Sequence, residues 1–126
     1  MRSYGAVETI DHTTVSVPDA VQQMHPSGID MLVDLASDAD GFATLAAHVR
    51  LGGTALTTRY VADTEALASR GVAGVNFRVG MSSDALEQLA DIVVSDTIVV
   101  PPITRVELED VPALNGNTDG KTVITL

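Results

Sequence analysis

The chain has 126 residues, of which 45% are hydrophobic and 3% aromatic, and its formal net charge is −10. This length allows one domain with a real core, but it is short for an enzyme that must hold both a dinucleotide and a substrate. Because nucleic-acid binding depends on neutralising phosphates, the excess of 17 acidic over 7 basic residues disfavours it.

The absence of cysteine excludes disulfides, thiol catalysis and thiolate zinc sites. His12, His25 and His48 have no spacing typical of zinc ligands, so we expect no metal. The amino terminus has no apolar stretch of signal-peptide length, and no window is long and apolar enough to span a bilayer. These features predict a cytoplasmic protein without a membrane partner.

The first third of the chain predicts a strand, a helix and a second strand. Val7 to Ile10 is a short apolar run, and apolar residues then recur at helical spacing over residues 17–24. Ser16 is the candidate N-cap, and Pro18 lies near the helix start, where proline is tolerated. Ile29 to Leu35 predicts a buried strand.

The middle of the chain continues the alternation. A helical stripe begins after Asp38 or Asp40 as N-cap, and Gly52-Gly53 is expected to end that helix before a strand at Thr54 to Thr58. Thr64 to Arg70 predicts a short helix, and Val72 to Val79 a further strand. The stripe consists of Phe42, Leu45, Ala46 and Val49.

The last third begins with a helix at Ala85 to Val94, where Asp84 and Glu87 have the spacing of a capping box. The following extended run, Ile98 to Val106, contains Pro101-Pro102, which places it at a sheet edge or a domain crossing. The remaining segments predict a short helix at Leu108 to Leu114, a loop at Asn115 to Gly120 and a strand at Thr122 to Leu126. Alternating elements of this kind predict an α/β fold with a parallel sheet.

Several segments, in their order and spacing, resemble the second half of the nucleotide-binding domain of quinone-oxidoreductase-like medium-chain dehydrogenases/reductases. Tyr4 to Asp11 resembles the approach to the third Rossmann strand of that family, and Gly28 to Asp34 its fourth strand. Leu45 to Thr58, with Gly52-Gly53, resembles the segment that ends in the fifth strand.

The carboxy-terminal part extends the resemblance over essentially the whole chain. Leu86 to Ile103 resembles the helix and exit strand that leave the nucleotide domain. Val106 to Val111 and Gly120 to Ile124 resemble the family's last segments, although Val106-Glu107 replaces the usual aromatic-proline pair.

The resemblance implies the distal half of a Rossmann-like parallel sheet with helices, followed by C-terminal return strands. Residues 1–100 would form a partial nucleotide-binding domain, and residues 101–126 would pack on a catalytic domain that the chain lacks. The family's glycine-rich pyrophosphate loop does not occur in the sequence. We therefore expect a truncated chain that is inactive alone, whose intact parent reduces a quinone or enone with NADP(H) or NAD(H).

Ligands of open parallel sheets bind beyond the carboxyl ends of the strands. By resemblance, Asp11 and His12 would lie near the adenine, Leu35-Ala36-Ser37 near the ribose and nicotinamide, and Thr57 and Thr58 on the nicotinamide side. A purely structural role remains open, in which Ser37 caps the next helix and the threonines end a strand. We expect no catalytic residue in this segment, because the cofactor supplies the chemistry.

The strand at 72–79 carries two further predictions. Phe77 and Arg78 would turn toward the nicotinamide, with Arg78 as a donor to a phosphate or carboxylate, unless it is an ordinary surface arginine. By resemblance the same strand is a sheet edge that pairs with its counterpart in a homodimer. Because the family's first two strands are missing, either residues 7–10 pair beside residues 29–35 or another chain fills the gap.

Two other classes of function remain open. The chain could be a non-catalytic dimerisation or assembly module, such as a fragment, a pseudoenzyme or one part of a split protein. It could also be an unrelated small α/β ligand-binding domain.

Overall fold

The computed structural model describes residues 1–78, 80, 82–95, 97–100, 102–114 and 121–125. These residues form two compact units, Met1–Gly80 and Met81–Leu126, which are described separately. The predicted division after residue 100 concerned the domains of a larger parent enzyme and stays a prediction. Within the described residues, no helix combines the length and apolar character needed to cross a membrane.

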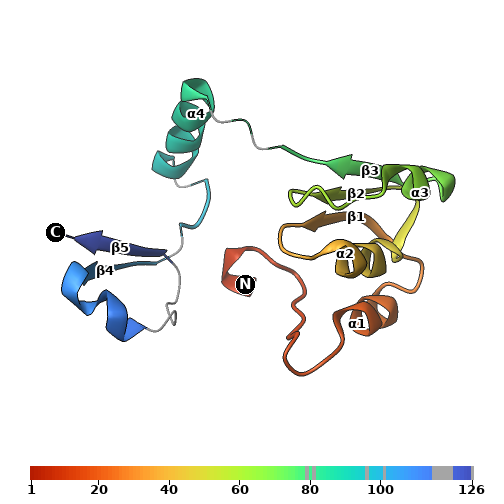
Figure 1. Ribbon diagram of the computed structural model, residues 1–126, viewed down its shortest axis with the longest axis horizontal. Coiled ribbons are helices and arrows are strands. Elements are labelled where there is room, and N and C mark those ends of the chain that lie inside the picture. The colour runs from red at the N-terminus through yellow and green to blue at the C-terminus, as the bar shows by residue number, and fades with distance from the viewer. Residues whose placement is uncertain (79, 81, 96, 101, 115–120, 126) are drawn as a thin grey trace. The chain divides into compact units, whose positions relative to one another are not determined.

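The N-terminal unit is an α/β arrangement around one sheet of three parallel strands in the order β1-β2-β3 (Figure 1). This confirms the predicted α/β class with a parallel sheet. The elements in chain order are η1 (Arg2–Tyr4), α1 (Val17–Met24), β1 (Ile29–Asp34), α2 (Ala39–Ala46), β2 (Val49–Thr57), α3 (Thr64–Ser69) and β3 (Ala73–Asn76).

Side-chain caps define where the three α-helices of this unit begin. Ser16 Oγ accepts from the Asp19 N–H at 3.5 Å, as predicted for α1. Asp38 Oδ1 accepts from the Gly41 N–H at 2.9 Å, which decides between the two candidate caps of α2. Asp63 does the same for α3. Each cap satisfies a backbone donor that the first helical turn leaves without a partner.

The sheet has one face covered by α2 and α3 and one that we call the open face. The covered face holds the core, which consists of Phe42, Ala46, Val49, Ala55, Leu67 and Val72. The open face carries the alternate strand positions, and there Met31 and Val33 are 52% and 56% exposed. Parallel sheets are normally covered on both faces, whereas among the described residues of this unit the helices that contact the sheet, α2 and α3, lie on the other face.

The predicted end of α2 is wrong, because the residues from Val49 to Gly53 belong to β2 and form a bulge there. The helix ends at Ala46, and Val49 already belongs to β2, where it is buried. Its place in the helical stripe was therefore a coincidence of spacing. Gly52 and Gly53 do not end the helix but lie inside β2, where the register with β1 shifts from Ile29↔Val49 to Met31↔Thr54.

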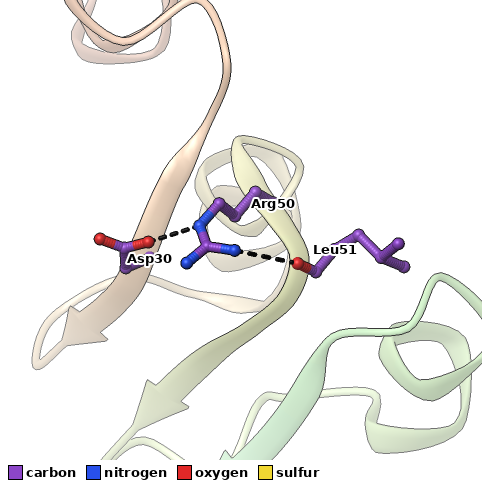
Figure 2. A network of polar contacts seen from close by, with 3 residues as sticks. All are labelled: Asp30, Arg50 and Leu51. Carbon is purple, nitrogen blue, oxygen red and sulfur yellow. Dashed lines mark hydrogen bonds and ion pairs between the residues drawn. The ribbon is translucent and has the colours of Figure 1, made fainter.

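The backbone of the bulge requires glycine at position 52. Gly52 has a φ of 79°, which side-chain-bearing residues rarely adopt, and its N–H donates to the Gly71 carbonyl at 2.8 Å. Across the same bulge, the Arg50 guanidinium donates to the Asp30 carboxylate and, at 3.4 Å, to the Leu51 carbonyl (Figure 2). Both side chains are exposed, so this ion pair contributes little to stability.

The predicted strand at Val7 to Ile10 is wrong. These residues form no strand, and Val7 is 88% exposed. Within the described residues β1 pairs only with β2, so the idea that residues 7–10 pair beside β1 is wrong as well. Glu8 Oε2 instead lies at hydrogen-bond distance, 2.9 Å, from Nε2 of His25 at the end of α1. An apolar run becomes a strand only where a neighbouring strand offers hydrogen-bond partners.

The C-terminal unit contains α4 (Ser83–Val94), β4 (Ile103–Glu107), η2 (Leu108–Leu114) and β5 (Lys121–Thr125), with β4 and β5 paired in parallel. The cap of α4 is Ser82, which accepts from the Ala85 N–H at 3.1 Å; the predicted cap Asp84 lies in the first turn.

Three further boundaries in this unit differ from the prediction or refine it. The predicted strand at 98–106 begins only after the prolines, since proline donates no ladder hydrogen bond. The short helix with Pro112 inside it is a 3-10 helix. The final strand begins at Lys121. The predicted loop at 115–120, together with Val79, Pro101 and Leu126, lies outside the described residues.

Candidate functional site

Polar side chains form a row across the carboxyl edge of the sheet. Asp34 ends β1, Thr57 ends β2 and Asn76 ends β3, and their Cα atoms are partners in the register. Register partners in parallel strands point to the same face, which here is the covered face. In open α/β sheets this edge is where ligands bind.

Asp34 shapes the loop that follows β1. Its Oδ1 accepts from the backbone N–H groups of Ala36 and Ser37 at 3.0 and 2.8 Å, and the Ser37 hydroxyl donates to Oδ2 at 2.6 Å. Burial raises the pKa of this carboxyl, but the bonds from Ser37 and Ala36 and the charge of Arg59 outweigh it, so the pKa lies below its ordinary value. Asp34 is therefore an ionised anchor for residues 36 and 37 rather than a proton donor.

Ser37 does not cap the following helix, because Asp38 holds that position. The capping role predicted for Ser37 is therefore wrong, but a structural role stays open, because its hydroxyl donates to the Asp34 carboxylate. Thr57 is fully buried, and its hydroxyl accepts from the Arg59 N–H at 3.0 Å. Thr58 follows, half-buried, and donates its N–H to the Asp34 carbonyl at 3.3 Å.

Asn76 is the member of the row that sequence reasoning missed. Its side chain makes two hydrogen bonds of 3.0 Å to the backbone of Ala62, one as acceptor and one as donor. It thereby holds the loop between β2 and α3 against the end of β3. The sequence predicted that this strand runs to residue 79, so its end was placed beyond Asn76. The signal that could have located the true end is the polar Asn76 directly after a short apolar run.

A pocket of about 340 Å³ lies between the segment that leads into and begins α1 and the segment that runs from Ser37 along α2. It brings together two predicted cofactor residues, His12 and Ser37, which lie 25 positions apart in the sequence. Its walls mix an imidazole, hydroxyl groups and aliphatic side chains. The lining residues are His12, Val15, Ser16, Val17, Pro18, Ser37, Gly41, Thr44 and Leu45.

The other predicted site residues do not line this pocket, and all of them except Asp11 follow or end one of the three strands. Asp11, next to His12, accepts from both the N–H and the hydroxyl of Thr13, and these bonds lower the pKa of its carboxyl. Leu35 and Ala36 are exposed in the loop before Ser37. The remaining residues belong to the ends of β2 and β3 and are Thr57, Thr58, Phe77 and Arg78.

The backbone contains one further feature at this edge. Tyr60, in the loop after β2, has a φ of 60°, and its side chain is 57% exposed. A non-glycine residue in the left-handed region is uncommon and is held there by its surroundings. In this loop the hydrogen bonds of Thr57 and Asn76 to Arg59 and Ala62 fix the residues on either side of it.

Comparisons with known proteins place the fold. No family model and no curated protein matches the sequence. Among solved structures, a quinone oxidoreductase from Pseudomonas syringae pv. Tomato DC3000 aligns with 99% of the chain at a TM-score of 0.69 and 20% identity. A Bacillus thuringiensis chain assigned as an NADPH:quinone reductase aligns with 97% at 0.68 and 23% identity. An NAD-dependent alcohol dehydrogenase aligns with 97% at 0.68 and 19% identity.

The chain spans only 44%, 43% and 38% of the lengths of these three proteins. Likeness at this level of identity concerns the fold, and it agrees with the resemblance seen in the sequence. The chain therefore has an α/β fold with parallel strands that matches less than half of the quinone oxidoreductase and alcohol dehydrogenase structures.

Proposed function

We propose that the chain supplies part of a dinucleotide site in an NAD(P)H-dependent oxidoreductase. The observation that carries the proposal is the shared pocket of His12 and Ser37 beside the end of β1. Its volume of about 340 Å³ is at the lower end of the range typical of ligand sites. A pocket of this size suits one heterocycle with its ribose rather than a whole dinucleotide.

In this proposal the adenine end lies in the pocket, between the His12 imidazole and the aliphatic side chains of Val15 and Leu45. Asp34 holds the Ser37 segment in place for the ribose. Residues at the ends of β2 and β3, including Thr58 and Arg78, would lie on the nicotinamide side. This direction agrees with the rule that ligands cross the carboxyl edge of a parallel sheet.

The reaction class is hydride transfer between the nicotinamide and a quinone or enone. It is favoured by likeness to structures described as a quinone oxidoreductase and an NADPH:quinone reductase. The cofactor carries the redox chemistry, and the protein positions it. Because the sequence has no glycine-rich pyrophosphate loop, we expect this chain to hold the adenine end weakly and to have no activity alone.

Titration of AMP against the purified chain, followed by isothermal calorimetry, tests the proposal. His12→Ala should weaken AMP binding about tenfold, equivalent to roughly 1.4 kcal/mol. His48→Ala is the matched control, since His48 bonds to Gln22 and lies outside the pocket. Absence of AMP binding to the parent chain, or equal affinity of the His12 variant, would contradict the proposal.

A second candidate function is an assembly module, favoured by the open face and by β1 and β3, which each pair with only one strand among the described residues. Unpaired strand edges with apolar side chains readily accept another strand. The specific proposal is a homodimer through the edge strand at residues 72–79, of which the structure describes β3 from Ala73 to Asn76.

Sedimentation equilibrium tests the dimer. We expect the parent chain to associate and Ala73→Lys to be monomeric, because Ala73 is exposed on β3 and an edge lysine opposes strand pairing. Leu51→Lys, a lysine at another exposed apolar position, should leave the association unchanged. A monomeric parent, or an Ala73 variant that associates equally, would refute the edge-strand dimer.

A further inference from the structure

A second hollow lies on the other side of α2, between that helix and α3, with a volume of about 180 Å³. It shares no residue with the His12 pocket: Gly41, Thr44 and Leu45 line that pocket, whereas other positions of α2 line this one. The lining residues are Ala39, Phe42, Ala43, Ala46, Val61, Asp63, Ala66, Leu67 and Arg70.

The hollow exists because the two helices present small side chains to each other. Ala39, Ala43 and Ala46 lie along one side of α2, and Ala66 lies on α3. Below them the floor is core: Phe42 and Leu67 are only 2% and 6% exposed. The floor is therefore fixed by the packing of the sheet, while the alanines leave the space above it empty.

The two charged residues that line the hollow form hydrogen bonds with backbone groups at the ends of α2 and α3. Asp63 caps α3 by accepting from the Ala66 N–H at 3.0 Å, and the Arg70 Nη2 donates to the Ala47 carbonyl at 3.0 Å. They are of opposite sign and about seven residues apart on α3, or roughly 10 Å. The space between them is lined by carbon atoms, which disfavours a charged ligand.

The volume limits the ligand further. Sites for drug-sized molecules have about 300 Å³ or more. An enclosed apolar cavity of about 150 Å³ takes up benzene or xenon, and this hollow, which is open to solvent on one side, has room of about 180 Å³ for one ring with a small substituent. The buried Phe42 ring in the floor offers an aromatic neighbour, which favours an aromatic ligand.

We infer that the hollow between α2 and α3 is a binding site for a small, uncharged, single-ring aromatic compound. The site is separate from the proposed nucleotide pocket, with α2 as the wall between them. Failure of either proposal therefore leaves the other to be judged by its own experiment.

Toluene titrated into the full chain, followed by the methyl NMR signals of Leu67 and Val61, tests the site. Both residues line the hollow, so their methyl signals should shift saturably. Ala66→Leu places extra carbon atoms in the hollow and should weaken toluene binding at least about tenfold, since the pocket then lacks room for the ring. Ala68→Leu is the matched control, because Ala68 is also exposed on α3 but does not line the hollow.

Circular dichroism of both leucine variants checks that they keep the parent fold, which is expected because both positions are exposed. Linear, unsaturable shifts in the parent, or equal toluene affinity in the Ala66 and Ala68 variants, would overturn the inference. Sedimentation at the same concentrations tests whether a second copy of the chain, rather than a small ligand, occupies the hollow. If Ala66→Leu dissociates an oligomer and toluene shifts neither methyl signal, the hollow is a contact between copies and the ligand site is refuted.

Discussion

Replacing Asp34 with alanine is expected to lower the free energy of unfolding by about 2–4 kcal/mol. The carboxylate is buried and accepts three hydrogen bonds from residues 36 and 37, so its removal leaves two backbone donors and the Ser37 hydroxyl without their partner. Guanidinium unfolding followed by circular dichroism measures the change.

Asp30→Ala provides the control for the Asp34 substitution. Asp30 lies on the same strand, but its side chain is exposed and pairs only with an exposed arginine, so the expected loss is below about 1 kcal/mol. Equal losses in the two variants would show that the Asp34 hydrogen bonds do not anchor the loop.

The Asp34→Asn variant tests the protonation state. The pKa of Asp34 lies below its ordinary value of 3.8, so the unfolded chain binds the proton more readily than the folded one. The stabilisation is therefore fully present above about pH 3.8 and is lost as the pH falls through the folded-state pKa. The difference in unfolding free energy between parent and variant should shrink over that range, whereas a difference independent of pH would contradict the ionised anchor.

Replacing Gly53 with alanine is expected to destabilise the fold by about 1–3 kcal/mol. A Cβ atom at this position would lie 2.6 Å from the Asp30 carbonyl oxygen and 2.6 Å from Val49 Cγ1. The Asp30 carbonyl belongs to the backbone of the paired strand β1, so it can move only by distorting the sheet, and the Val49 side chain is buried in the core. The midpoint of thermal unfolding measures the effect.

Gly80→Ala is the control for the bulge substitution. Among the residues that the structure describes, no heavy atom lies within 4 Å of a Cβ built at Gly80, and its φ is outside the left-handed region. We expect a change within about 0.5 kcal/mol. A Gly53 variant as stable as the Gly80 variant would mean that the bulge adapts to a side chain, and the close approach of β1 and β2 would carry no cost.

Much of the local structure could be predicted from the sequence because its signals are local. The Ser16 cap, the start of α3 at Thr64 and the apolar run of β1 need only neighbouring residues, and they were predicted correctly. The Asp38 cap was one of two candidates. The parallel α/β class followed from the alternation of such segments.

The errors arose where a distant partner decides the structure. Val7 to Ile10 has strand composition but no strand beside it, so it stays irregular. Val49 continues the helical stripe of α2, yet pairing with Ile29 draws it into β2. Gly52 and Gly53 resemble a helix end, but they serve a bulge whose register depends on β1.

For the candidate site, the sequence by itself placed the ends of β1 and β2 within one residue of Asp34 and Thr57, but it extended β3 beyond Asn76 and placed a strand before Asp11 that does not form. It named His12 and Ser37 separately. Only the tertiary structure decided that these two line one pocket, that Ser37 bonds to Asp34 rather than capping α2, and that Asn76 secures the next loop. The row of strand ends and the Asn76 bonds depend on the register of three strands, in which residues far apart in the chain become neighbours, and local propensity carries no information about that register.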